Sequence, residues 1–147
     1  MVVPAFAAYD MYLAINGVAG SAADTKHTDW IPVTEIQDNT LQPAGTVPLV
    51  ITKPINSISG ALYKACLTGY RYPQGMLDVC KDGILISRTT MDEITITRIK
   101  PEFTKKDTDP KEEITLSFKV INWEFYGADG KAVTPKTGWN NEQKRIM

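Results

Sequence analysis

The chain has 147 residues, of which 43% are hydrophobic and 22% are charged, and its formal net charge is −1. This length suits one domain with a sizeable core, and the apolar runs are far shorter than the ~20 residues that a membrane-spanning helix needs. The balanced charge offers no excess of Lys or Arg for phosphate backbones. We therefore expect no membrane span and no nucleic-acid partner.

The first eight residues, MVVPAFAA, are apolar and end in the small-residue pattern of a secretory cleavage site. They lack the basic region and the longer apolar run of a complete signal peptide. The alternatives are a truncated signal remnant and a disordered or mis-started tail. We take residues 1–8 as a tail and residues 9–147 as a single domain.

Most of the chain has the two-residue alternation or the β-branched composition of strands. Pro32 suggests an edge or bulged position for the second strand, and Asp82-Gly83 is a strong hairpin signal. The predicted strands are Tyr9–Ile15, Trp30–Asp38, Thr46–Lys53, Gly75–Lys81, Ile84–Arg88, Met91–Lys100 and Glu113–Tyr126.

One helix is predicted, at Ser57–Thr68. Ser57 or Ser59 can accept a backbone N–H at its start, and Gly69 can adopt the left-handed conformation that ends it. Apolar residues recur at intervals of three and four, which predicts one face that packs against a sheet. These residues are Ile58, Ala61, Leu62, Ala65 and Cys66.

The segment Thr104–Glu113 is rich in Lys, Asp and Glu around Pro110, so we expect a solvated, mobile loop. In the strand that follows, the apolar positions change parity after Val120. A β-bulge near Val120 and Ile121 would restore one buried face. Alternatively, both faces are covered, and the second face becomes a candidate subunit interface. Its residues are Ile121, Trp123 and Phe125.

Several short strands with one helix are typical of a mainly β protein, either a barrel or a sandwich with the helix on its outside.

Residue types that carry enzyme chemistry are scarce. His27 is the single histidine and has no nucleophile signature nearby, so a loop-capping or solvent-exposed role is expected. Asp24 and Asp29 beside it are typical turn formers. Cys66 and Cys80 lack the spacing of zinc ligands and are expected to be buried thiols, with a disulfide as the alternative. We predict no catalytic, cofactor-binding or metal residue and no enzyme activity.

The opening segment Y-D-M-Y-L-A-I-N-G-V-A-G is followed by several short motifs in a fixed order. These are Asp24, His27, Trp30-Ile31, Ile51-Thr52-Lys53, Ile55, Leu62, Ala65-Cys66, Gly69, Leu116, Phe118, Tyr126, Ala128-Asp129-Gly130 and Gly138-Trp139. In order and spacing, from Tyr9 to Asn140, the chain resembles the Hcp family, the tube-forming proteins of bacterial type VI secretion systems.

The resemblance implies a rolled antiparallel β-barrel with one flanking helix at about residues 57–68, and homohexameric rings that stack into a tube. A contractile sheath drives such a tube, with a spike at its tip, out of the bacterial cytoplasm into the extracellular space or a target cell. Small effector proteins travel in the lumen. The implied function is therefore that of a structural tube subunit whose partners are itself, the sheath, the spike and effectors.

Some positions depart from the family pattern. Ser21 and Ala22 stand where the family usually has Glu and then Ser, and Thr34–Thr46 is short where the family carries a stacking loop. Lys81–Met91 is also abbreviated. Gln37 falls near a lumen-facing position, although its residue type does not match. The alternatives are a specialised paralogue that acts as a secreted effector or effector carrier with impaired stacking, and a small ligand-binding β-barrel.

Overall fold

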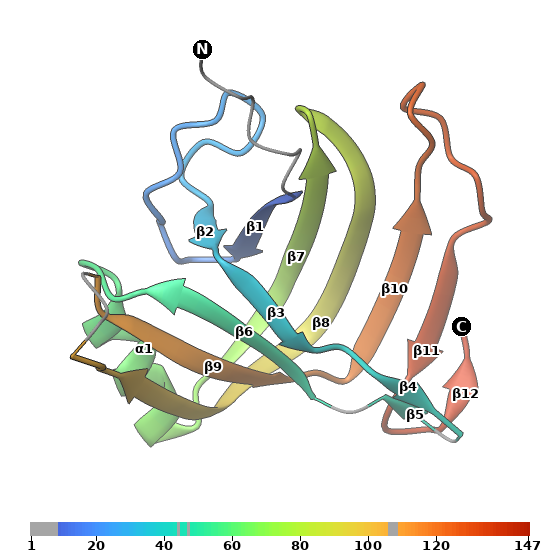
Figure 1. Ribbon diagram of the computed structural model, residues 1–147. Coiled ribbons are helices and arrows are strands. Elements are labelled where there is room, and N and C mark those ends of the chain that lie inside the picture. Colours follow the sequence, from blue (N-terminus) through green and yellow to red (C-terminus); the bar gives the residue numbers. More distant parts are fainter. Residues whose placement is uncertain (1–8, 44, 47, 106–108) are drawn as a thin grey trace, which may run out of the picture.

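Figure 1 shows a computed structural model of the chain, in which residues 9–43, 45–46, 48–105 and 109–147 are described. The predicted tail, residues 1–8, lies outside the described residues. Residues 106–108 of the predicted mobile loop do so as well.

The described residues form one helix and a mainly antiparallel β structure, with a ten-stranded sheet and a separate two-stranded ribbon. The strands of the large sheet are β1 (Tyr9–Ile15), β2 (Ile31–Val33), β3 (Glu35–Asp38), β6 (Leu49–Pro54), β7 (Arg71–Lys81), β8 (Ile84–Glu102), β9 (Lys111–Ser117), β10 (Val120–Phe125), β11 (Thr137–Asn140) and β12 (Arg145–Ile146). The ribbon consists of β4 (Leu41–Gln42) and β5 (Gly45–Thr46).

The long strand β8 organises the sheet. One of its sides pairs with β7, and the other pairs first with β10 and then with β9. The predicted strands Ile84–Arg88 and Met91–Lys100 are therefore parts of one strand. The hairpin turn before it is confirmed, because Asp82 and Gly83 both have positive φ, 52° and 78°.

The sheet rolls up without closing by strand pairing (Figure 1). Its β1-β2 end and its β6-β3 end meet at Thr34, whose N–H and hydroxyl both donate to the carbonyl of Thr52, at 2.9 and 3.0 Å. The mainly β, antiparallel fold with one helix is confirmed. The roll is completed by the chain itself rather than by a ladder, because Thr34 alone separates β2 from β3.

The predicted strand Glu113–Tyr126 is two strands, β9 and β10, separated at Phe118 and Lys119. Strand β8 changes its buried parity at the facing level, where Glu93 has a φ of 52°. Both strands therefore bend together, and the residues before and after the bend enter one core. Leu116, Phe118, Ile121 and Trp123 all belong to that core cluster. The segment thus keeps a single buried face. The irregularity that allows this is the break between β9 and β10, which lies two residues before the expected bulge.

Helix α1 (Ser59–Thr68) ends as predicted, because Gly69 has a φ of 68° and the N–H of Tyr70 donates to the carbonyl of Ala65. Its start differs from the prediction. No side chain caps the helix, and the hydroxyl of Ser59 instead accepts the N–H of Asn56 and donates to Glu112. Leu62 and Ala65 are buried as expected, whereas Ala61 is exposed.

A buried ion pair fixes the start of the helix to the sheet. Lys53 Nζ on β6 lies 2.9 Å from Glu112 Oε2 on β9, and both side chains have no exposed surface. Ser59 donates to the same carboxylate oxygen at 2.7 Å. The expectation of a solvated loop through Glu113 is therefore wrong at its end, where Lys111–Glu113 are strand and Glu112 lies inside the protein.

No helix among the described residues has the length and apolar character needed to cross a membrane.

Candidate functional site

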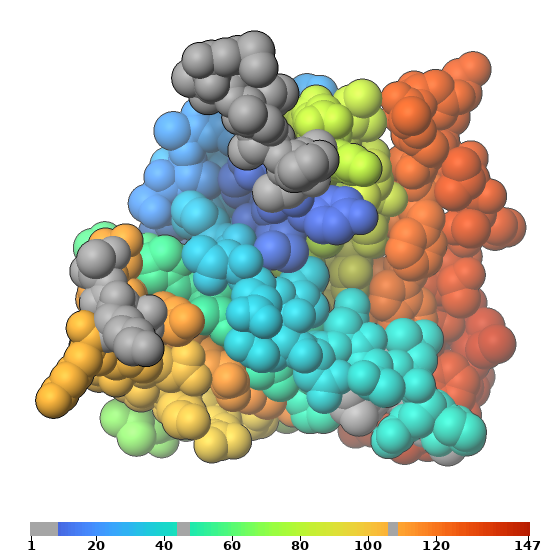
Figure 2. Space-filling model, viewed as in Figure 1, coloured from blue at the N-terminus to red at the C-terminus, as the bar shows by residue number. Residues whose placement is uncertain are grey.

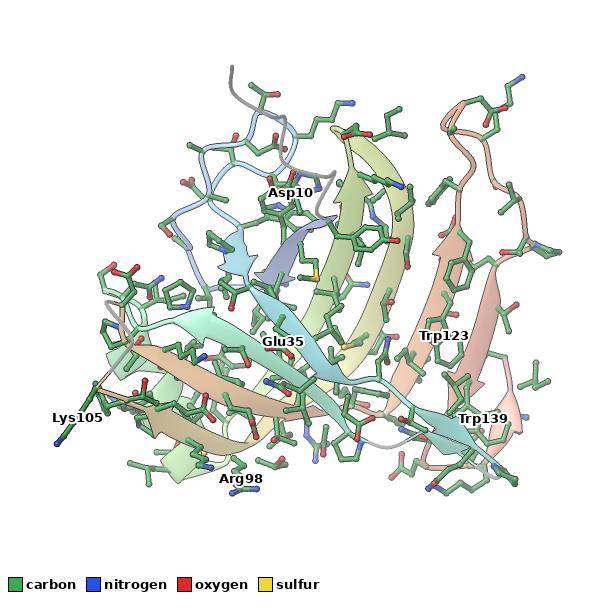
Figure 3. All side chains as sticks on the ribbon, in the orientation of Figure 1. Asp10, Glu35, Arg98, Lys105, Trp123 and Trp139 are labelled. Atoms are coloured by element: carbon green, nitrogen blue, oxygen red, sulfur yellow. The ribbon has the colours of Figure 1, made fainter. Side chains whose placement is uncertain are left out.

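The three predicted interface residues follow one another on the core-facing side of β10. Ile121 has no exposed surface and Trp123 is 9% exposed, whereas Phe125 is 45% exposed. Figure 3 shows Trp123 on β10 beside β11, which carries Trp139. The row therefore runs from the core of the subunit to its surface, and Phe125 is the member that offers most area to a neighbour.

Phe125 and Trp123 line an open hollow of about 460 Å³ between β10, the start of β4 and the start of β11. The other residues of its lining are Asn39, Leu41, Thr134 and Thr137. Leu41 is 60% exposed, so the hollow combines three apolar side chains, Leu41, Trp123 and Phe125, with three polar ones. Such a surface can take an apolar side chain from another molecule.

A second apolar surface lies on helix α1 and was missed in the sequence. Leu67 is 87% exposed, and it lines a hollow together with Tyr63, Cys66, Ile99 and Pro101. The spacing of apolar residues identifies only the buried face of a helix, so it gives no signal for an exposed apolar residue such as Leu67. The sequence feature that could have indicated this exposed apolar surface is the lack of charged residues in the helix, whose only ionic side chain is Lys64.

Gln37, the predicted lumen residue, is exposed on β3. It is the extra residue of a bulge, because Ile36 and Asp38 face consecutive residues of β6. Its amide donates to the hydroxyl of Thr52 at 3.0 Å. The ribbon β4-β5 follows β3 in the chain and lies at the lower right of the molecule in Figure 2.

A polar cluster fastens the loop between β1 and β2 to the sheet. His27 Nδ1 lies 2.6 Å from Asp24 Oδ2 in the same loop, and Nε2 lies 2.8 Å from Asp78 Oδ2 on β7. Arg88 on β8 binds both oxygens of Asp78, each at 2.8 Å. His27 is only 4% exposed, so the solvent-exposed alternative is wrong and the loop-holding one is what the structure has.

Aromatic rings and hydrogen bonds set the electrostatics of this cluster. Tyr12 stacks on His27 with ring centroids 4.3 Å apart, and Trp30 meets the imidazole edge-on at 4.8 Å. The hydrogen bond from His27 lowers the pKa of Asp24, and the hydrogen bonds to Asp78 raise the pKa of Arg88. Burial raises the pKa of Tyr12.

The cluster holds two carboxylates against both imidazole nitrogens, so neither nitrogen is free to take a proton from a nucleophile. Within the described parts of the chain, no group of three or more His, Cys, Asp or Glu side chains could hold a metal ion. Cys66 and Cys80 are both free thiols, the first half-buried and the second buried as expected. Burial raises the pKa of the Cys80 thiol.

The fold is similar to solved structures of type VI secretion proteins. Hcp1 from Salmonella typhimurium has a TM-score of 0.85 at 23% identity, covering 97% of this chain and 100% of that one. A type VI secretion system effector from Yersinia pestis has a TM-score of 0.81 at 21% identity, with coverages of 89% and 99%. The secreted protein Hcp3 from Pseudomonas aeruginosa has a TM-score of 0.71 at 18% identity, with coverages of 90% and 98%.

At these identities the structural likeness concerns the fold. A search of curated protein sequences finds no match. The sequence itself matches the family model described as "Type VI secretion system effector, Hcp" over residues 12–125, which is most of its length. The chain therefore belongs to the Hcp family of type VI secretion systems.

Proposed function

We propose that the chain is a structural subunit of the inner tube of a bacterial type VI secretion system, which forms homohexameric rings that stack. The family match over residues 12–125 carries this proposal. The exposed apolar surfaces around Phe125 and Leu67 support it, because surfaces of this kind are usually covered by another protein.

The proposed work is mechanical. Rings assemble in the cytoplasm, a sheath drives the stacked tube and its spike outward, and the subunits leave the cell with it. Small effector proteins ride in the lumen, toward which we place Gln37. None of these steps needs a catalytic group, and the occupied nitrogens of His27 agree with a role that involves no reaction.

The specialised-paralogue alternative differs from this proposal in one respect, the stacking of rings into a tube. The segment Thr34–Thr46, expected to be a short loop, contains β3 and the ribbon β4-β5. We propose this ribbon as the contact between rings, since it projects beyond the rolled sheet (Figures 1 and 2). A secreted carrier with impaired stacking would form rings that stay single.

The ligand-binding alternative would need space inside the rolled sheet, where the described residues pack closely. Large side chains fill the inside of the rolled sheet, and each of them is at most 1% exposed. They include Leu13, Ile31, Leu77, Met91 and Ile94.

Light scattering coupled to size-exclusion chromatography tests the ring. We expect a particle of about six times the 16.3 kDa chain. Electron microscopy of the same fraction should show hollow rings, and tubes at high concentration. A chain that stays monomeric at high concentration would contradict the proposal, and persistent single rings would favour the paralogue.

Variants of the β10 row separate interface from fold. Phe125→Arg should give a folded monomer, because it places a charge on the exposed apolar hollow, whereas Phe125→Leu should keep the ring. Trp123→Arg should lower stability instead, since Trp123 lies in the core cluster. An unchanged ring in Phe125→Arg would remove this residue from the interface.

A further inference from the structure

Ring assembly gives no reason for the buried motif of Asp24, His27 and Trp30. His27 is the single histidine of the chain, it is almost completely buried, and each ring nitrogen lies within hydrogen-bond distance of a carboxylate oxygen. When a histidine lies between two carboxylates on opposite sides of its ring, the number of protons on the ring decides whether both contacts can be hydrogen bonds.

A neutral imidazole has one N–H donor and one nitrogen lone pair, and an ionised carboxylate can only accept. A neutral ring would therefore turn a lone pair toward one of the two carboxylates at 2.6 or 2.8 Å. Such a contact is repulsive in a buried site. Either the ring carries both protons or one carboxylate is protonated.

Both carboxylates are supplied with hydrogen-bond donors by their surroundings. Asp78 accepts from Arg88 at both of its oxygens and from His27 at one, which is the hydrogen bonding that a carboxylate anion favours. Asp24 also accepts the backbone N–H of Lys26, at 3.3 Å, and its pKa is lowered by the hydrogen bond to His27. The second proton is thus left on the imidazole.

We infer that His27 is an imidazolium at neutral pH and acts as a proton-dependent clasp that fastens the β1–β2 loop to strand β7. In this state the cluster alternates in charge, from Asp24 to His27 to Asp78 to Arg88, and its formal charges cancel. The stacked ring of Tyr12 presents its π face to the cation, a favourable contact.

The clasp opens with rising pH. When the imidazole loses a proton, one carboxylate loses its donor, and the loop loses either its internal brace at Asp24 or its tie to Asp78. Because the folded state holds this proton and the unfolded chain releases it, the stabilisation is complete at lower pH and is lost as the pH rises.

Several other ionisable groups face the cluster, and each of them can also contribute to the pH dependence of stability. The loop contributes Lys26, β1 contributes Asp10 and Tyr12, β7 contributes Cys80, and Glu124 and Tyr126 lie beyond Arg88. A matched variant is therefore needed to assign the effect to His27.

The ring nitrogens can be observed directly by ¹⁵N NMR of the intact protein, in which one histidine gives one pair of side-chain signals. We expect both nitrogens to be protonated at neutral pH, each with its attached hydrogen. A spectrum with one bare nitrogen in the folded protein at neutral pH would overturn the inference, and it needs no variant.

Asp24→Asn provides the second measurement. The amide can donate to a neutral imidazole, so this variant needs only one ring proton. We expect one bare nitrogen in Asp24→Asn, and a Tm that stays level between about pH 6 and pH 9 while the parent Tm falls by roughly 3 to 8 °C. The control is Asp29→Asn, which changes the same charge at an exposed turn residue and should behave as the parent. Parallel profiles for the parent and Asp24→Asn would also overturn the clasp.

Discussion

Two charged residues in the interior, Lys53 and Glu112, show what individual side chains do for this fold. Each has no exposed surface, and they meet across β6 and β9 at 2.9 Å while Ser59 and Asn56 supply further hydrogen bonds. Isolated burial of either charge would be costly, so the pair is stable only as a unit. It joins the chain before the helix to the strand that follows the long loop.

Replacing Lys53 with Met should therefore lower the free energy of unfolding by about 3 to 5 kcal/mol, because Glu112 is left buried and unpaired. Urea denaturation measures this loss. Lys64→Met, on the exposed face of α1, is the control and should change stability by no more than about 0.5 kcal/mol. The double variant Lys53→Met/Glu112→Leu should recover much of the loss. If Lys53→Met and Lys64→Met were equally stable, the buried ion pair would contribute no more to stability than an exposed lysine does.

At the scale of elements, the sequence predicted what depends on neighbours along the chain. The end of the helix at Gly69 and the turn at Asp82-Gly83 need only local backbone preferences. The bend in β9-β10 was visible as a change of parity, but its cause is the facing bend at Glu93 in β8. Local rules do not see a partner strand before the pairing is known.

The candidate sites were harder to predict for the same reason. Asp78 lies 51 residues from His27, and Glu112 lies 59 residues from Lys53. Nothing in the local pattern around Asp78 or Glu112 distinguishes a buried carboxylate from a solvated one, because the fold alone brings the partners together. Family resemblance supplied His27 as a motif residue without its role.

Two glycines of the helix region should respond to alanine in opposite directions. Gly69 has a φ of 68° and open space where a Cβ would lie, so Gly69→Ala should cost about 1 to 2 kcal/mol of backbone strain alone. Gly60 lies inside α1 with the same open space and ordinary helical φ, so Gly60→Ala should stabilise by about 0.5 to 1 kcal/mol. Chemical denaturation of both variants checks the pair, and a stabilising Gly69→Ala would contradict the left-handed helix end.

For the whole molecule, stability is expected to fall off from the core toward the C-terminal edge. Strands β6 and β9 pair along six residues and bury Leu49, Ile51 and Leu116 completely. At the other extreme, β12 pairs with β11 at two positions, and Ile146 is 73% exposed. The last strand therefore has little within its own subunit to hold it.

Hydrogen exchange should report this gradient. In the monomer expected for Phe125→Arg, the amides of β12 should exchange at nearly the rate of an unfolded chain, and those of β6 and β9 only through global unfolding. Slower exchange of β12 in the ring would locate a subunit contact at this edge. Slow exchange in the monomer itself would refute the gradient.

The shared bend at Glu93 and Lys119 gives the molecule a fixed curvature. Strand β8 runs through the bend without a break, and the ion pairs from Glu93 to Lys119 and to Arg71 brace it from outside. No loop interrupts β8 between the two halves, so no loop rearrangement in it can change the angle between them. The curvature of the rolled sheet at this level therefore depends on the backbone of one residue, Glu93, whose φ of 52° turns β8 without ending it.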